Sequence, residues 1–484
     1  MTTIASSDRR RPAGAKDLLA GGVRPAREVG ASDRRPRRLA FEILRWVDER
    51  DAYANLVVAE RLGASGFEAR DAALVTELVY GTLRMRGILD AVLARGSSRP
   101  LDRIDPPALD VLRLGAYQLL FTRIPPHAAV AETVAVARVA VNASVTGFVN
   151  AVLRRVAERS LEEWLPVIAP SYDEDPLGHL AAISSHPRWI AQAFADSLGG
   201  DLTETAAALA ADNERPAVHL AARPGETDRD AVVAGLGHRG IPGPYSPYAV
   251  HLTDGSPGDL ASVRDHRVQV QDEGSQLAAL ALGRAVVGGP EQRWLDMAAG
   301  PGGKAVLLAG LAAERGIHLV ANDIAPHRAR LVAENLAGRP PGTLVISADG
   351  RAPAWAPATF DRVLLDAPCT GLGALRRRPE ARWRRQEASV TALAALQREL
   401  LTTAIAATRP GGIVAYVTCS PDLHETVDVV GWAQATQDGV DFVDVRPLLP
   451  GVPHLGPGPW VQLWPHRQGT DAMFIALLSV NPVS

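Results

Sequence analysis

The spacing of apolar residues first predicts a helical region. From residue 36 to 160, apolar residues recur three and four positions apart, as in LAFEILRWV and ARDAALVTELVYGTLRMRGILDAVL. This period is typical of amphipathic helices. The pair Pro125-Pro126 breaks the pattern and predicts a boundary between two helices. We therefore expect residues 36–160 to form an all-helical domain.

The next two regions have different patterns. Residues 161–265 combine a helical stretch near 189–198 with alternating segments such as AVHLAARP and with Gly- and Pro-rich turns. This mixture predicts a small α+β linker subdomain. From residue 266 to 484, short apolar strands alternate with helical segments, which is typical of a doubly wound α/β domain with a mostly parallel sheet. The strands that we expect are 293–297, 318–323, 343–347, 362–366 and 413–418.

Ligands of such sheets bind at the carboxyl ends of the strands. The first predicted strand is followed by a glycine-rich loop, and the loop residues are Ala298, Ala299, Gly300, Pro301, Gly302, Gly303 and Lys304. A phosphate-binding P-loop needs a hydroxyl residue after the lysine, where the chain has Ala305, and the dinucleotide pattern G-x-G-x-x-G is also absent. S-adenosylmethionine remains as the expected cofactor.

Two acidic residues have positions that suit this cofactor. Asp323 ends the second strand, where a carboxylate can bind ribose hydroxyls, and Asp349 follows the third strand, where it can bind the adenine edge. The alternative is that these residues only cap helices. Acidic residues at three successive strand ends favour the binding interpretation.

The two cysteines of the chain lie on the same predicted edge. Cys369 follows the fourth strand in Asp366-Ala367-Pro368-Cys369, and Cys419 follows the fifth. Carbon 5 of cytosine becomes nucleophilic when a thiolate adds to carbon 6. The reaction also needs an acid near ring nitrogen 3, for which Asp366 is the candidate, and we expect its pKa to be raised.

These motifs together resemble the RsmB (Sun or Fmu) branch of the RNA cytosine-C5 methyltransferases. The family loop D-A-C-A-A-P-G-G-K is matched from Asp296 to Lys304, with Met297, Ala298 and Gly300 as departures. The family motifs D-A-P-C, T-C-S and V-Q-D-E are also present. The resemblance implies that Cys419 is the nucleophile, that Cys369 assists product release, and that Asp366 and the loop bind S-adenosylmethionine. It also implies a NusB-like RNA-binding domain before a Rossmann-like catalytic domain.

Composition and charge add further expectations. No apolar run is long enough to span a bilayer and the N-terminus lacks an apolar stretch, so we expect a cytoplasmic protein without a membrane segment. Two cysteines exclude a multi-cysteine metal site, and we expect no metal. Net charge is −3, but residues 1–38 carry ten basic and four acidic residues, a local net of +6, which predicts a disordered basic arm over residues 1–35.

The expected partner is RNA. Residues 376–385 carry six arginines, one glutamate and Trp383, and we expect phosphate contacts and base stacking there. The resemblance points to small-subunit (16S) ribosomal RNA, and a monomer is the default expectation. The alternatives are a tRNA cytosine-C5 methyltransferase, a DNA methyltransferase, which the second cysteine disfavours, and a non-catalytic RNA-binding protein.

Overall fold

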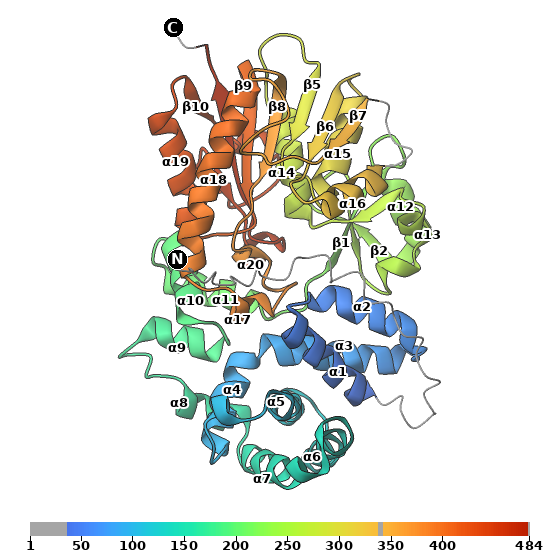
Figure 1. Ribbon diagram of the computed structural model, residues 1–484, viewed down its shortest axis with the longest axis vertical. Coiled ribbons are helices and arrows are strands. Elements are labelled where there is room, and N and C mark those ends of the chain that lie inside the picture. Colours follow the sequence, from blue (N-terminus) through green and yellow to red (C-terminus); the bar gives the residue numbers. More distant parts are fainter. Residues whose placement is uncertain (1–35, 337–341, 483–484) are drawn as a thin grey trace, which may run out of the picture.

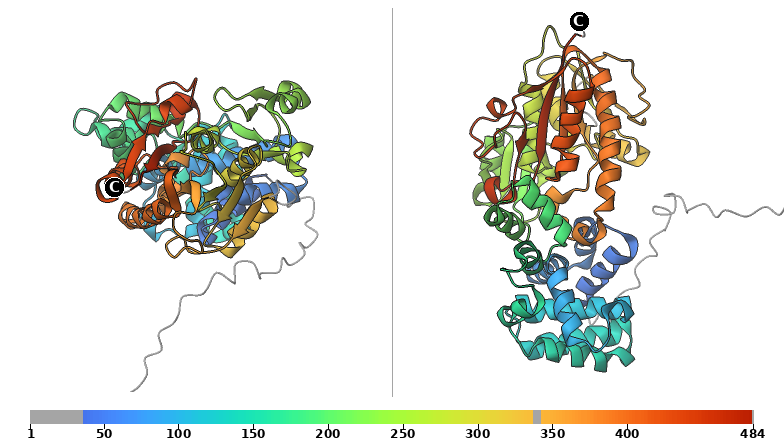
Figure 2. Two further views of the ribbon diagram at one scale, coloured as in Figure 1. Left: turned by 90° about the horizontal axis from the view of Figure 1, so that it is seen from above. Right: turned by 90° about the vertical axis from the view of Figure 1, so that its left-hand side faces the viewer.

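The computed structural model of the protein describes residues 36–336 and 342–482. The basic arm predicted for residues 1–35 lies outside this range. Figures 1 and 2 show a helical domain at one end of the molecule and an α/β domain at the other, with the linker region between them.

The N-terminal domain is helical, as predicted. Its helices are α1 (Pro36–Arg50), α2 (Ala54–Ser65), α3 (Ala69–Arg84), α4 (Arg86–Gly96), α5 (Pro106–Phe121), α6 (Pro126–Val136), α7 (Thr146–Val156) and α8 (Leu161–Ile168). Helix α5 is the central one, because residues 110–118 are all buried and it packs against α1, α3, α4, α6 and α7. The predicted break is confirmed, since α6 begins at Pro126, a favoured residue at the first position of a helix.

The region between the two domains contains helices and then a small sheet. Its elements are α9 (Pro176–Ile183), α10 (Arg188–Ser197), α11 (Leu202–Ala211), β1 (Val218–Ala222), α12 (Arg229–Leu236), β2 (Gly240–Pro242), β3 (Ala249–Leu252), α13 (Ala261–Arg264) and β4 (Val268–Val270). The strands form an antiparallel sheet in the order β2-β3-β1-β4. The alternating segment of the sequence coincides with β1, whereas α9 and α11 were not predicted.

The α/β domain is built on one large sheet. Its strands are β5 (Arg293–Asp296), β6 (His318–Asn322), β7 (Thr343–Ile346), β8 (Phe360–Asp366), β9 (Thr408–Thr418), β10 (Val440–Val443), β11 (Val461–Gln462) and β12 (Phe474–Val480). They follow the order β10-β12-β9-β8-β5-β6-β7, with β11 beside β12. Strands β5 to β9 are parallel and confirm the five predicted strands, whereas β12 inserts antiparallel between β9 and β10.

Helices cover both faces of this sheet (Figure 1). The helices of the domain are α14 (Glu273–Arg284), α15 (Gly303–Ala313), α16 (Pro326–Leu336), α17 (Ala381–Arg384), α18 (Ala388–Ala407), α19 (Val427–Thr436) and α20 (Pro465–Gln468). One apolar core joins α14 and α15 to the sheet, and a second joins α18 and α19 to its other face. This three-layer arrangement confirms the predicted Rossmann-like class.

The chain reverses its direction of winding beside β5. From β5 it continues through β6 to β7 on one side, and then returns to β8 and β9 on the other side of β5. The loops that follow β5 and β8 therefore separate at the switch point of the sheet, where ligands of this fold class bind. No helix in the part of the chain described here is long and apolar enough to cross a membrane.

Candidate active site

The glycine loop joins β5 to α15 and is tied to the end of β6. The backbone amide of Gly300 donates to Oδ2 of Asp323 over 3.0 Å. A Cβ atom at position 300 would lie 2.4 Å from the same oxygen, so the alanine that the family loop has here would require the side chain of Asp323 to shift. Gly302, at the N-terminus of α15, has a φ of 116°, a conformation that L side chains rarely adopt. The loop thus brings backbone close to a buried carboxylate.

The two predicted cofactor carboxylates, Asp323 and Asp349, differ in their burial and in their hydrogen-bond partners. Asp323 is 2% exposed and accepts from the amides of both Gly300 and Ala325, so it shapes the loop as well as the turn before α16. The carboxylate of Asp349 is instead partly exposed and is bonded to Arg351 over 2.7 Å. Those hydrogen bonds lower the pKa of Asp349 to about 2. An adenine contact from Asp349 would have to compete with this pair.

Asp296, the last residue of β5, is buried next to the glycine loop and was not a predicted site residue. Its side chain is fully buried at the end of β5. Neither oxygen accepts a well-aligned hydrogen bond from a described residue, although Lys304 and the Ala298 amide lie close enough to stabilise its charge in part. Burial, followed by the negative charge of Asp366, raises the pKa of Asp296 to about 8. A buried carboxyl without partners is a feature that a bound ligand can satisfy.

These observations fit S-adenosylmethionine. The cofactor is a sulfonium cation with an ammonium group, and the buried carboxyl of Asp296, which accepts no hydrogen bond from a described side chain, lies beside a loop whose backbone approaches Asp323 closely. Asp323 supplies acceptors at the next strand end. The residues that would hold the cofactor are therefore the 298–304 loop, Asp323 and Asp296, with Asp366 at the border to the cysteines.

Lys304 connects the cofactor loop to the cysteine-bearing loops. It is 8% exposed in the first turn of α15, and its Nζ donates to Oδ2 of Asp366 over 2.9 Å. Burial alone would lower the pKa of Lys304, but the carboxylate of Asp366 outweighs it and the net shift is upward. Asp366, which the sequence presented as a proton donor to ring nitrogen 3, is here the acceptor of an ion pair.

The two cysteines meet at the ends of β8 and β9. The strands are parallel neighbours that pair Asp366 with Val417, and the Sγ atoms of Cys369 and Cys419 are 3.5 Å apart. Both thiols are free and partly exposed. The hydrogen bond from Cys369 lowers the pKa of Cys419 against the effect of burial, with help from Lys304 and Arg378. The same hydrogen bond and burial raise the pKa of Cys369. The two shifts have opposite signs, so Cys419 is the more acidic thiol of the pair.

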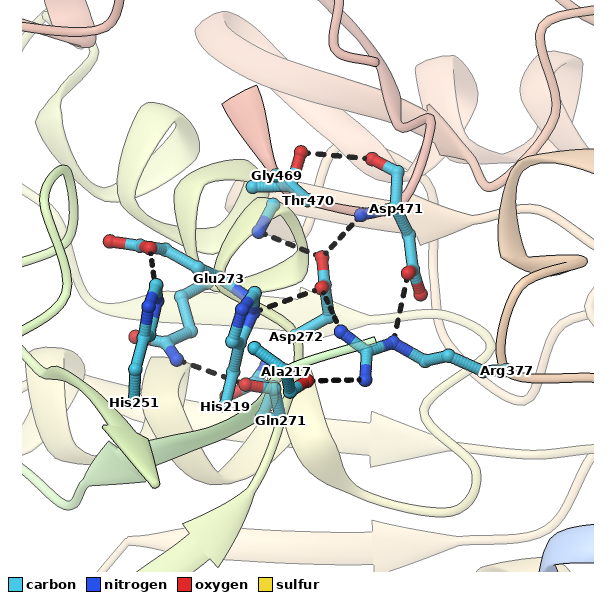
Figure 3. Close-up of polar contacts among 12 residues, drawn as sticks. Ala217, His219, His251, Gln271, Asp272, Glu273, Arg377, Gly469, Thr470 and Asp471 are labelled. Carbon is cyan, nitrogen blue, oxygen red and sulfur yellow. Dashed lines mark hydrogen bonds and ion pairs between the residues drawn. The ribbon is translucent and has the colours of Figure 1, made fainter. Parts of the chain in front are cut away.

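The V-Q-D-E segment forms a buried ion cluster beside the site (Figure 3). Asp272 accepts from Arg377 over 2.7 Å, contacts His219 at 3.1 Å and accepts the amide of Asp471 at 3.1 Å. Burial would raise the pKa of Asp272, but His219 and Arg377 outweigh it and hold this pKa well below its usual range. The cluster joins β1, the start of α14, the arginine segment and the loop before β12.

The prediction of phosphate contacts by residues 376–385 is wrong for most of its arginines. Arg376 and Arg377 are paired with Asp272 and Asp471. Arg382 is fully buried, where it donates to Oδ1 of Asn213 over 2.6 Å and to the carbonyl of Asp212 over 2.7 Å. These groups pair inside the protein, and sequence spacing does not reveal burial.

The remainder of that segment contacts the helical domain. Arg384 donates to the carbonyl of Val47 and is paired with Asp51, and the amide of Ala54 donates to Glu380 over 3.1 Å. Trp383 lies against α4, where a Cβ at Gly87 would come within 2.7 Å of its ring. Segment 378–384 therefore docks the two domains, and Trp383 is packed within protein rather than free to stack on a base.

Comparisons with known proteins agree with the two-domain organisation. Residues 286–479 match the family described as 16S rRNA methyltransferase RsmB/F, and residues 34–158 match the NusB family. A protein of Mycobacterium tuberculosis, named for methyltransferase activity, is 56% identical over 91% of this chain and 96% of its own length. Ribosomal RNA small subunit methyltransferase B of Pseudomonas putida is 35% identical over 78% of this chain and 84% of its own length.

Solved structures have the same fold. The crystal structure of PH0851 superposes with a TM-score of 0.77 at 22% identity, over 92% of this chain and 98% of that one. The structure of NSun6 from Pyrococcus horikoshii with SFG gives a TM-score of 0.52 at 18% identity, over 61% of this chain and 98% of that one. By its sequence relatives and its domain content, the chain belongs to the RsmB/F family of S-adenosylmethionine-dependent methyltransferases, with a NusB-like domain at its N-terminal side.

Proposed function

We propose that this protein methylates carbon 5 of a cytosine in small-subunit (16S) ribosomal RNA through a covalent adduct on Cys419. The observation that carries the proposal is the pair of thiols 3.5 Å apart on the strand edge that also holds the glycine loop. A hydrogen bond from Cys369 lowers the pKa of Cys419 and leaves it as the stronger nucleophile. The name of the Pseudomonas putida relative supports ribosomal RNA as the substrate class.

The residues have distinct tasks in this reaction. The Cys419 thiolate adds to carbon 6 of the cytosine, which forms the sulfur–carbon bond and makes carbon 5 nucleophilic. S-adenosylmethionine supplies the electrophilic methyl group. We assign the contact with ring nitrogen 3 to Asp366, whose carboxylate accepts a hydrogen bond from Lys304. Loss of the carbon 5 proton and of the thiolate from carbon 6 then restores the ring, and we assign assistance in this release to Cys369.

A cysteine at each of two neighbouring strand ends separates this proposal from the non-catalytic alternative. A non-catalytic RNA-binding protein has no need for a thiolate beside a cofactor loop. A tRNA substrate would use the same chemistry, so only the identity of the methylated RNA distinguishes it. The target base also has to leave its stack to reach the thiol pair.

The test is transfer of a labelled methyl group to small-subunit ribosomal RNA, with tRNA as the parallel substrate. We expect 5-methylcytidine with wild type, no product with Cys419→Ala, and a protease-sensitive RNA adduct that accumulates with Cys369→Ala. Full activity of Cys419→Ala would refute the nucleophile, and labelling of tRNA alone would refute the ribosomal substrate. Tight RNA binding without transfer by wild type would favour the non-catalytic alternative.

A further inference from the structure

A buried carboxyl group lies directly beneath the two cysteine loops. Glu425 ends a short turn, Leu423–Glu425, that follows β9, and its side chain is fully buried. Its backbone is fixed by the hydroxyl of Tyr416, which donates to the Glu425 carbonyl over 2.7 Å. The turn therefore aims the carboxyl back toward the loop that contains Cys419.

This carboxyl is bonded to the loop of the other cysteine. Oε1 of Glu425 accepts the backbone amide of Thr370 over 2.8 Å, and Oε2 accepts the Thr370 hydroxyl. Nε2 of Gln397, on α18, donates to Oε1 over 3.2 Å and to the carbonyl of Pro368 over 2.9 Å. Pro368 and Thr370 flank Cys369, so the position of this cysteine is set from both sides.

The two loops are also joined to each other around Glu425. The Thr370 hydroxyl lies 3.2 Å from the hydroxyl of Ser420, and the amide of Gly373 donates to the carbonyl of Cys419 over 2.9 Å. Without the carboxyl, the Thr370 amide would be a buried donor without its acceptor, a state that costs free energy and favours movement of the loop, and the Thr370 hydroxyl would keep only its contact with Ser420. A movement of about 1 Å is enough to separate reacting groups.

We propose that Glu425 is a positioning residue that clamps the Cys369 loop to the Cys419 loop and so keeps the two sulfur atoms in contact. The inference deepens the proposed function and rests on it for the roles of the cysteines. Glu425 contacts Thr370 and not the reacting atoms, so it acts through the loops. The pKa of Cys369 is raised first by its hydrogen bond with Cys419 and by burial, and ionised Glu425 adds to this shift, while burial raises the pKa of Glu425 as well.

The test asks whether the two thiols lie close enough to bond one arsenic atom, and it needs neither RNA nor cofactor. Phenylarsine oxide, a trivalent arsenical, bonds two thiols at once, and these are the two cysteines of the chain. We expect wild type to bind one equivalent and lose both titratable thiols, and Glu425→Ala and Thr370→Val to bind it at least about tenfold more weakly. Thr408→Val is the matched control, because it removes a buried hydrogen bond of a threonine hydroxyl, to the carbonyl of Ala404, and leaves the clamp in place.

A second readout separates clamping from a loss of stability. In Glu425→Gln the shape remains and the charge is lost, so we expect iodoacetamide to alkylate Cys369 faster at neutral pH than in wild type, as mapped by mass spectrometry. In methyl transfer, kcat of Glu425→Ala should fall about 100-fold with little change in KM. Arsenical binding and alkylation equal to wild type in folded Glu425→Ala and Glu425→Gln would overturn the proposal, even if methyl transfer to RNA is never observed.

Discussion

Replacement of Asp296 by asparagine should stabilise the protein at neutral pH. In the folded protein the pKa of Asp296 is raised from its ordinary value of 3.8 to about 8, first by burial and then by the charge of Asp366. Between these two pH values the folded state keeps a proton that the unfolded state releases. Stability of the wild type therefore falls as pH rises through this window, by about 1.4 kcal/mol per pH unit.

The size of the effect follows from the width of the window. A pH of 7 lies about 3 units above the ordinary carboxyl pKa of 3.8, which applies to the unfolded state. Keeping Asp296 protonated in the folded state therefore lowers the free energy of unfolding of the wild type by about 4 kcal/mol at this pH. The amide side chain introduced by Asp296→Asn has nearly the same shape as the protonated acid and does not titrate. The variant and wild type should thus have equal stability near pH 4 and diverge up to pH 8.

Urea denaturation of wild type and Asp296→Asn at half-unit intervals from pH 4.5 to 8.5 measures this difference. Asp349→Asn is the matched control, since the pKa of Asp349 is lowered to about 2 and its titration lies below the range. Parallel pH profiles for wild type and Asp296→Asn would refute the assignment of an uncompensated buried carboxyl. We also expect Asp296→Asn to bind S-adenosylmethionine more weakly by calorimetry, with a smaller loss for S-adenosylhomocysteine, which lacks the sulfonium charge.

Three other changes test the rest of the site. Lys304→Met should slow alkylation of Cys419 by iodoacetamide at pH 7, about tenfold for each unit by which the thiol pKa rises, because Lys304 helps to lower that pKa; an unchanged pH–rate profile would contradict this role. Gly302→Ala should weaken cofactor binding at least about tenfold, since a φ of 116° is strained for alanine at the start of α15, whereas Gly235→Ala, with open space around it, should bind normally in the same titration. Arg382→Met should lower the free energy of unfolding, measured in urea, by about 2–4 kcal/mol, because it leaves the carbonyl of Asp212 and the side chain of Asn213 without their donor. The same substitution at the exposed Arg385 should have little effect.

The sequence was sufficient for the parallel strands and the cysteine edge, and physical reasons explain what it missed. Strand β8 has a short apolar run, Val363-Leu364-Leu365, that ends at Asp366, a pattern typical of buried parallel strands. Strand β12 has a longer apolar run, in the sequence FIALLSV, but it follows a long irregular segment and pairs antiparallel with a strand distant in sequence. Its place in the sheet depends on tertiary pairing, which periodicity does not encode.

Polar residues show the same limit more sharply. The charge of the 376–385 segment is evident from its letters, but the carboxylates that neutralise Arg377 belong to Asp272 and Asp471, about a hundred residues away in either direction. Asp296 was visible as part of a family motif, but only its burial without hydrogen-bond partners marks it as a candidate ligand-facing group. Glu425 lies six residues after Cys419, and nothing in that spacing shows that it bonds to the loop of Cys369.

The ionisable groups at this edge are connected, so the cofactor loop and the cysteines should respond to each other. Lys304 belongs to the cofactor loop, yet its charge is shared between Asp366, to which it is bonded, and Cys419, whose pKa it helps to lower. Asp366 in turn raises the pKa of Asp296 through its negative charge. A cation bound against Asp296 would favour ionisation of that carboxyl, and the negative charge gained there would offset the added positive charge next to Cys419. Cofactor binding can therefore place a methyl donor beside the thiolate while the local charge that sets the thiol pKa changes little.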